Sequence, residues 1–461
     1  MEYYVGYDIG TTNLKCLLLS SDGIIEKVIK ESTPKVKYKS YLFFDLKRIE
    51  TFVDQTLDEL CASYPVKSVG FSTIGESIIP IKDGKAICNP PLWDEKDITS
   101  TKEEREKIES FATSEIIGTL TKPLFSIHKI LWMKRELEGV RNADLFLPLS
   151  SYFVYRKTGV AAWDYSQASR SGVFDIRRKE WIGELLDYFS IPLPERILPM
   201  GSFVGNNNGI SYGLGGHDHI VGFYGIEKTF RDTDKVLYYS SMGTSEVMAT
   251  LVDESKTSSF IPSAKGYLQP AFFPNMYTAT RSFRSFGSML ESIRTLTSFS
   301  STYEDANYEI EKLANSTPPC LFTSVGDFIQ NDSDSTWLNI YKIKRGCKKE
   351  ELVEGAYLYL SVVSEIMRES LEKQYSLNND GLFVVGGGIT KNKTFLSYLS
   401  SSIKNPVLLL DTEEISALGA ALVGQNTVSD EHVPIKYSEI EKSAKLKSLV
   451  QETKKCYEAL F

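Results

Sequence analysis

Histidine and paired cysteines, the residues that most often bind structural metals, are scarce in this chain. It has four histidines and six cysteines, and none of the cysteines forms a C-x-x-C pair. A zinc site is therefore not expected. Scattered single cysteines are typical of a reduced chain, so we expect a cytoplasmic protein whose six thiols are free and buried. No apolar run approaches the ~20 residues that a membrane-spanning helix needs, and we expect no membrane partner.

Positive charge is also in short supply. The 461 residues include 52 Lys and Arg against 60 Asp and Glu, which gives a net charge of -8. Without a basic stripe, a nucleic-acid partner is not expected. The hydrophobic fraction of 42% and the charged fraction of 24% are ordinary for a globular enzyme, and the length predicts two domains. The chain begins directly with a strand pattern, so we expect no signal peptide.

Two similar turns stand about half a chain apart. Residues 5–15 read V-G-Y-D-I-G-T-T-N-L-K, and residues 237–246 read L-Y-Y-S-S-M-G-T-S-E. In each, an apolar strand runs into a Gly-Thr turn and a second strand follows. Such turns direct backbone N–H groups and hydroxyls to one point, which makes an anion cradle. Two cradles that face each other across a cleft would bind the phosphates of one nucleotide. The predicted nucleotide-binding residues of the two turns are Gly10, Thr11, Thr12, Asn13, Gly243, Thr244 and Ser245.

Asp8 lies at the end of the first of these strands, next to the first cradle. A carboxylate in this place is suited to Mg²⁺, which prefers one or two carboxylates together with phosphate oxygens and water. An aspartate in a turn can instead hydrogen-bond its own backbone. The presence of a second cradle favours the metal interpretation.

A glycine-rich segment, residues 213–225, reads G-L-G-G-H-D-H-I-V-G-F-Y-G. Its glycines predict tight turns and close packing. Asp218 stands between two histidines in this frame, and a carboxylate on the floor of a cleft is the general base that a hydroxyl nucleophile requires. Because adjacent side chains diverge along a chain, we do not expect the His-Asp-His run to bind a metal. Structural hydrogen bonding is the simpler role for His217.

Three consecutive glycines, Gly386, Gly387 and Gly388, follow an apolar strand and precede a predicted helix. Bare backbone lets a ligand approach closely, although triple glycines also serve as plain strand-to-helix turns. Behind two phosphate cradles, this turn is the natural site for adenosine and the α-phosphate, and we include Asn392 in it.

The hydrophobic pattern predicts a mixed α/β fold in two halves. In the first half we expect strands at 3–9, 14–20, 24–30 and 66–72 and a helix over 49–60. In the second half we expect strands at 236–242, 247–252, 266–273, 382–385 and 407–410 and a long helix over 352–375. A charged segment at 226–234 is the expected boundary.

In their order along the chain, these motifs resemble the FGGY carbohydrate kinases of the actin–hexokinase–Hsp70 superfamily. They are D-I-G-T-T at 8–12, G-G-H-D-H at 215–219, M-G-T-S at 242–245, G-G-G at 386–388 and A-L-G-A-A at 417–421. The resemblance implies two ribonuclease-H-like domains with a cleft between them. Residues 1–228 would carry the sugar site and the first phosphate motif, and residues 229–461 would bind the nucleotide. It also implies ATP and Mg²⁺ as cofactors and transfer of the γ-phosphoryl group to a sugar hydroxyl.

The resemblance also assigns individual residues. Asp218 matches the catalytic base of the family, and Asp8 matches its magnesium-associated carboxylate. Glycerol kinases carry an Arg-Glu pair in their substrate-contact turn; here the arginine position is Gly75, and the carboxylate is retained as Glu76. Trp93 matches an aromatic wall against sugar carbons. The predicted substrate-binding residues are Glu76, Trp93, Asp218, His219 and Glu246.

Carboxylates accept hydrogen bonds from hydroxyls and repel a substrate carboxylate. Since no arginine is identified in the pocket, we expect a neutral sugar or polyol as substrate. A ketopentose such as xylulose is the leading expectation, because ketopentoses are common substrates in the family. Gluconate, glycerol and a ketotetrose stay open as alternatives. A catalytically inactive sugar-binding relative is less favoured because Asp8 and Asp218 are both present. A chaperone or filament protein of the superfamily is less favoured because it would need a large partner-binding domain or self-assembly surfaces and would have no use for the Gly-Gly-His-Asp-His element. A homodimer is also open, since many relatives form dimers.

Overall fold

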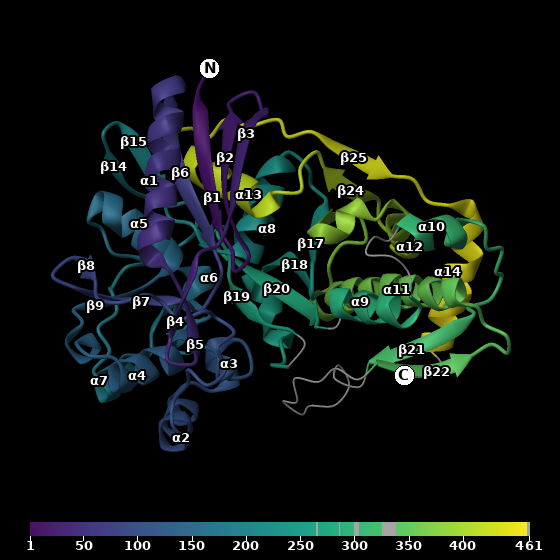
Figure 1. Ribbon diagram of the computed structural model, residues 1–461, viewed down its shortest axis with the longest axis horizontal. Helices are drawn as coiled ribbons and strands as arrows, with labels where there is room; N and C mark the ends of the chain where they lie inside the picture. Colours follow the sequence, from purple (N-terminus) through teal and green to yellow (C-terminus); the bar gives the residue numbers. More distant parts are fainter. Residues whose placement is uncertain (264–265, 285, 299–303, 325–337, 459–461) are drawn as a thin grey trace.

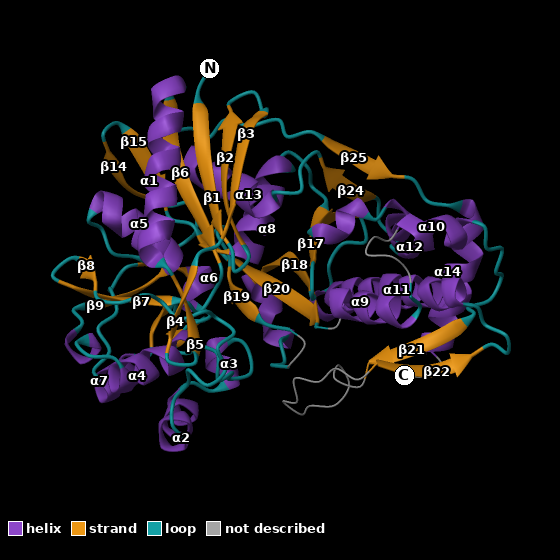
Figure 2. Ribbon diagram, viewed as in Figure 1, coloured by secondary structure: helices purple, strands orange, loops and turns teal. Residues whose placement is uncertain are grey.

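Two large mixed sheets, one from each half of the sequence, dominate the fold (Figure 1). The computed structural model describes residues 1–263, 266–284, 286–298, 304–324 and 338–458. Helices cover the faces of both sheets (Figure 2). This arrangement confirms the predicted α/β class with two sheet-rich parts.

The N-terminal sheet is built on a hairpin of two buried strands. Tyr3–Ile9 (β1) pairs antiparallel with Asn13–Ser20 (β2), and both strands were predicted within one residue of their bounds. A parallel strand, Val66–Thr73 (β6), lies on the other side of β1. The spatial order of the sheet is β14 (Phe203–Asn207), β15 (Ile210–Gly213), β6, β1, β2 and β3 (Ile25–Ser32), and β16 (Gly216–His217) also pairs with β6.

The C-terminal sheet repeats the hairpin, with one difference from the prediction. Its spatial order is β19 (Leu268–Pro270), β20 (Met276–Phe283), β18 (Glu246–Asp253), β17 (Val236–Met242), β23 (Gly381–Gly386), β24 (Val407–Leu410) and β25 (Tyr437–Ile440). The third strand was expected at 266–273, but the strand that pairs with β18 is β20. Residues 268–270 form only a short edge strand beyond it. Both segments are apolar enough to be strands, so the pattern alone could not choose between them.

Two helices lie between the sheets and connect the halves (Figure 1). One is α8 (Asp218–Thr229), and the other is α13 (Ile415–Gln425), which contacts both α8 and the strands β1 and β6. A Cβ atom on Gly6 would lie 1.9 Å from the carbonyl oxygen of Ala417, so glycine in β1 is what lets α13 approach the sheet this closely. A helix from the C-terminal half therefore covers the N-terminal sheet.

The outer face of the N-terminal sheet is covered by α1 (Leu46–Ser63) and α5 (Leu149–Thr158). The apolar positions that predicted a helix over 49–60 are all buried in α1. On the C-terminal sheet the long helix α11 (Lys349–Tyr375) packs against β18 and β20. The other helices are α2 (Lys102–Phe111), α3 (Ser114–Ile117), α4 (Ser126–Glu136), α6 (Tyr165–Ala168), α7 (Gly183–Phe189), α9 (Phe286–Leu296), α10 (Glu304–Glu311), α12 (Lys393–Ser402) and α14 (Ala444–Glu458).

Small sheets complete the fold. They are formed by β4 (Lys35–Tyr38) with β5 (Tyr41–Phe44); β7 (Ile78–Lys82) with β8 (Lys85–Ala86) and β9 (Leu145–Pro148); β10 (Trp163–Asp164) with β13 (Ile197–Leu198); β11 (Phe174–Asp175) with β12 (Glu180–Trp181); and β21 (Cys320–Ser324) with β22 (Leu338–Ile343).

Two expectations about the whole chain can be compared with the structure. All six cysteines are free, as predicted, but only Cys16 and Cys320 are buried, and Cys61 is exposed. Cys61 lies near the end of α1, outside its buried stripe. Among the described residues, no helix is both long and apolar enough to cross a membrane.

Candidate active site

The floor of the site is formed where β1, β6 and β16 end side by side. Asp8 of β1 is paired with Ser72 of β6, whose hydroxyl donates a hydrogen bond to Asp8 Oδ1 at 3.2 Å. The ammonium group of Lys15 lies 3.2 Å from Asp8 Oδ2 and also forms an ion pair with Glu414. Burial raises the pKa of Asp8 to about 6, although Lys15 acts in the opposite direction. The prediction missed Lys15, but the hairpin places it directly opposite Asp8.

The glycine-rich segment is packed too closely for other residues. A Cβ atom on Gly215 would lie 1.6 Å from the carbonyl oxygen of Phe71, and one on Gly216 would lie 2.4 Å from Ser166 Oγ. The backbone N–H of His217 donates to this same Ser166 Oγ at 2.9 Å. These contacts and the pairing with β6 fix the position of the segment. Asp218 follows directly as the first residue of α8.

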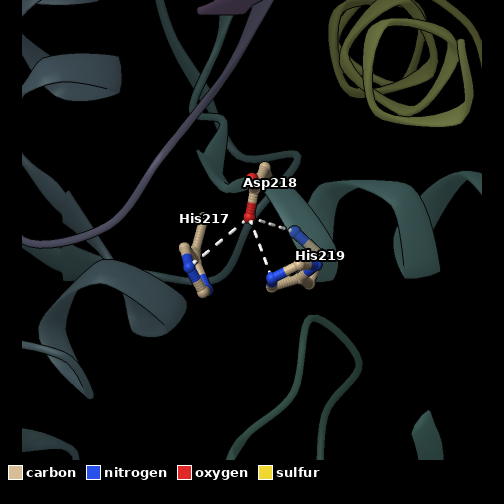
Figure 3. A group of neighbouring side chains, drawn as sticks. All are labelled: His217, Asp218 and His219. Carbon is tan, nitrogen blue, oxygen red and sulfur yellow. Dashed lines mark hydrogen bonds and ion pairs between the residues drawn. The ribbon is translucent and has the colours of Figure 1, made fainter. Parts of the chain in front are cut away.

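Asp218 is surrounded by the two histidines next to it (Figure 3). Its Oδ1 accepts a hydrogen bond from the backbone N–H of His219 at 2.7 Å. The Nε2 atoms of His217 and His219 lie 3.4 and 3.7 Å from the same oxygen. The prediction that these three side chains diverge is wrong, because one ligand atom from each lies within 4.8 Å of the others. The backbone is extended at His217 and helical from Asp218 onwards, and this change of direction brings the rings together.

The charge states of Asp218 and the neighbouring histidines are suited to a general base. Burial lowers the pKa of His217 to about 4, so this ring is neutral at neutral pH. Burial also raises the pKa of Asp218, but His219 and His217, the His219 backbone N–H and Lys15 outweigh that effect and hold it below its ordinary value. A partly exposed carboxylate that stays ionised at neutral pH can accept a proton from a bound hydroxyl.

Glu76 is held in a strained turn and paired with an arginine. Its φ angle is 58°, and the backbone N–H of Ser77 donates to the carbonyl oxygen of Gly75 at 2.8 Å. Such conformations cost free energy and concentrate at functional sites. The Glu76 carboxylate accepts a hydrogen bond from Arg170 Nε at 2.7 Å, and Arg170 Nη2 also contacts the same oxygen. The expectation of a pocket without an arginine is therefore wrong, because Arg170 reaches it from just beyond α6.

Trp93 connects the predicted sugar side to the first phosphate turn. Its indole N–H donates to Thr11 Oγ1 at 3.0 Å, while its side chain remains 37% exposed. The segment that carries Trp93 is fixed by Lys129, whose ammonium group donates to the carbonyl oxygen of Leu92 at 3.1 Å. Burial lowers the pKa of Lys129 to about 8.

Glu246 does not face this pocket, and its prediction as a substrate-binding residue needs correction. It is completely buried between β18 and α11. Its two carboxylate oxygens accept hydrogen bonds from Ser240 at 2.6 Å and from Ser364 at 2.8 Å. Side chains alternate between the two faces of a strand. Glu246 therefore lies on the face of β18 that packs against α11, and Val247 lies on the other face.

A cavity of about 450 Å³ lies in the C-terminal half, beside the second phosphate turn. Of the predicted nucleotide-binding residues, Gly243, Gly388 and Asn392 line it. The other lining residues are Met242, Phe286, Gly287, Leu290, Glu304, Asn307, Ile389 and Lys391. Apolar walls with a few polar groups are typical of a small-molecule site.

The middle glycine of the turn at this cavity cannot carry a side chain. Gly387 has a φ angle of 91°, and a Cβ atom on it would lie 2.4 Å from the carbonyl oxygen of Met242. Asn392 begins α12, where its Oδ1 accepts from the Phe395 backbone N–H at 3.0 Å and its Nδ2 donates to the Tyr357 hydroxyl at 2.8 Å. Asn392 therefore shapes the wall of the cavity through its contacts to the protein.

Comparison with known proteins agrees with this architecture. Residues 3–202 match the family model for the N-terminal domain of the FGGY family of carbohydrate kinases. A glycerol kinase from Bacillus velezensis is 24% identical over 457 residues, covering 91% of this chain and 89% of that protein. A xylulose kinase from Bacillus subtilis is 25% identical over 460 residues, covering 92% and 88%. The ligand-bound xylulose kinase from Lactobacillus acidophilus superposes with a TM-score of 0.82 at 17% identity, covering 100% of this chain and 98% of that one.

The chain carries the N-terminal domain of the FGGY family of carbohydrate kinases in residues 3–202. It is thus a phosphotransferase that acts on a sugar hydroxyl, and its family depends on ATP. In this kinase, the structure brings Asp8, Asp218, Trp93 and Thr11 into one region and keeps Glu246 out of it.

Besides Lys15, two further residues of this region could not be found from the sequence. Arg170 follows the D-Y-S-Q-A-S run at 164–169, and nothing in the local sequence relates it to Glu76. Tyr267 lies in the C-terminal half, yet its ring is 5.8 Å from the Arg170 guanidinium. Contacts between such distant segments depend on the tertiary fold.

Proposed function

We propose that this kinase transfers the γ-phosphoryl group of ATP to a hydroxyl of a neutral sugar or polyol, with a ketopentose such as xylulose as the best candidate. The observation that carries the proposal is the ionised, partly exposed Asp218 at the start of α8, between Asp8 and the Glu76–Arg170 pair. In this position it accepts the proton of the attacking hydroxyl.

The two turns and the cavity supply the nucleotide site in this proposal. The backbone N–H groups of the turns at residues 10–13 and 243–245 bind phosphates, and the cavity beside Gly388 takes adenosine. Residues 1–228 contribute the sugar site, and residues 229–461 contribute most of the nucleotide site. Phosphoryl transfer then depends mainly on positioning and on neutralisation of the phosphate charge.

Asp8 fits a role beside Mg²⁺. Within the described part of the chain, one oxygen accepts a hydrogen bond from Ser72 and the other contacts Lys15, and each has a further lone pair for a metal-bound water. Mg²⁺ would supply charge neutralisation at the phosphates. Lys15 adds a fixed positive charge at the same place, since its two carboxylate partners, Asp8 and Glu414, hold it there.

The charges of the acceptor pocket favour an uncharged substrate even with Arg170 present. Arg170 is paired with Glu76, so these two charges cancel, and Asp218 leaves the region negative. An acid sugar such as gluconate would meet that charge. Among the described residues, one oxygen of Glu76 and some N–H groups of Arg170 have no hydrogen-bond partner. These groups are suited to hydroxyl groups, which both donate and accept hydrogen bonds.

Measurement of ATP turnover against a panel of xylulose, ribulose, erythrulose, glycerol and gluconate tests the proposal. We expect stimulation by a neutral compound and the highest kcat/KM for a ketopentose. If gluconate is best by tenfold or more, the electrostatic argument is wrong. If no sugar stimulates turnover, the acceptor proposal fails.

A further inference from the structure

Tyr267 has a buried hydroxyl without a hydrogen bond of normal geometry among the described residues. Its Oη atom is excluded from solvent. The Thr280 hydroxyl is near enough to lower the pKa of this phenol, but its hydrogen bonds of normal geometry go to the backbone N–H and C=O of Tyr267 at 3.1 and 3.2 Å. A buried hydroxyl without a partner costs free energy and calls for an explanation.

The surroundings of this hydroxyl are those of the acceptor pocket. The Tyr267 ring lies 5.8 Å from the Arg170 guanidinium, and Phe125 lies 5.1 Å from the same group. Asp218 and Glu76 are close enough to act on the phenol electrostatically; burial, the largest effect, raises the pKa of Tyr267 to about 12. The hydroxyl is thus neutral, and it can donate or accept a hydrogen bond.

The chain position of Tyr267 sets it apart from the rest of the pocket. It directly precedes β19 of the C-terminal sheet, whereas Glu76, Asp218 and Arg170 all belong to the N-terminal half. The next residue, Leu268, donates its backbone N–H to the carbonyl oxygen of Gly118 at 2.9 Å. This contact fixes the start of β19 against the N-terminal half and holds the tyrosine at the pocket.

We propose that Tyr267 is a substrate-positioning residue, whose hydroxyl bonds to an oxygen of the neutral polyhydroxy acceptor other than the hydroxyl that attacks ATP. The inference rests on the proposed kinase function and deepens it. Asp218 takes the attacking hydroxyl, and the Arg170–Glu76 pair and Tyr267 hold the rest of the molecule. A site with a buried polar group rejects an analogue that lacks the matching hydroxyl, because the group is then left unpaired.

The test is Tyr267→Phe, which removes the hydroxyl and keeps the ring beside Arg170. We expect kcat/KM for the best sugar to fall about 10- to 100-fold, mainly through KM, while the Kd for ATP and the Tm stay within error. The matched control is Tyr375→Phe, which removes another buried hydroxyl without a partner, at the end of α11. We expect this control to leave kcat/KM unchanged.

Deoxy analogues of the best sugar make the assignment specific. One analogue should lose about the same factor with the wild-type protein and show no further loss with Tyr267→Phe, because the two changes remove the same bond. Unchanged kcat/KM in Tyr267→Phe, with a sugar-stimulated wild type, overturns the assignment and leaves the kinase proposal intact. Equal losses for every deoxy analogue, or a parallel loss of ATP binding and Tm, also overturn it, since they indicate a structural role. A wild type that no sugar stimulates overturns both.

Discussion

Replacement of Asp218 by asparagine tests the chemical centre of the proposal. The amide oxygen of the new side chain can still accept the hydrogen bond that the His219 backbone N–H now donates to Asp218 at 2.7 Å. The start of α8 should therefore keep its structure. What the variant loses is the negative charge and the basicity, since an amide does not accept a proton at neutral pH.

The size of the effect follows from general-base catalysis. A positioned base accelerates proton transfer by about 10²- to 10⁴-fold, which corresponds to about 2.7–5.4 kcal/mol in activation free energy. Hydrogen bonds to phosphates are not touched by the change. We therefore expect the single-turnover rate at saturating ATP and sugar to fall by at least 100-fold, with little change in the Kd for ATP.

The assay is rapid-quench phosphoryl transfer, with Tm and calorimetric ATP binding measured alongside. Asp58→Asn is the matched control, because Asp58 is exposed on α1, and its rate should equal that of the wild type. A folded Asp218→Asn variant that retains more than a tenth of the wild-type rate would refute the assignment of Asp218 as the base.

Three further predictions concern the turn, the sheet and the metal. Gly387 and Gly209 both have positive φ angles, but a new Cβ atom would collide with its surroundings only at position 387. Gly387→Ala should therefore lower the free energy of unfolding by about 1–3 kcal/mol more than the control Gly209→Ala does. It should also weaken ATP binding, which calorimetry can measure. Burial raises the pKa of Glu246 to about 7, so the stability that the protonated side chain contributes is present below pH ~4.5 and is lost as the pH rises through about 7. Glu246→Gln mimics the protonated form, and in urea titrations this variant should be more stable relative to the wild type at pH 8 than at pH 5. Equal stability differences at the two pH values would contradict this prediction. Asp8→Asn should raise the Mg²⁺ concentration needed for half-maximal turnover, and an unchanged Mg²⁺ curve would count against its role.

The hairpins of the fold could be predicted from the sequence almost to the residue. Their strands are short apolar runs joined by glycine-containing turns. Because one face must be buried, only one pairing register is favourable. The third strand of the C-terminal sheet could not be assigned, because residues 266–273 and 276–283 are both apolar and the choice depends on pairing with β18. The local pattern predicts that a strand exists, whereas the neighbouring strand with which it pairs depends on the whole sheet.

The same distinction separates the site residues that sequence could place from those it could not. Asp8, Gly387 and Asp218 lie within a few residues of turns whose shape the neighbouring residues dictate. Arg170 joins Glu76 from 94 positions away along the chain. The prediction for Glu246 was wrong although the local sequence was sufficient, since strand alternation places Glu246 on the α11 face of β18 and Val247 on the other face. The contact between Arg170 and Glu76, in contrast, depends on the tertiary fold.

The position of the proposed base depends on both halves of the chain. Asp218 begins α8, and α8 packs against α13, where Gly225 and Gly419 permit the close approach. The hydroxyl of Ser416, in the first turn of α13, donates to the carbonyl oxygen of Asp218 at 3.3 Å. A displacement of α13 would therefore also displace Asp218.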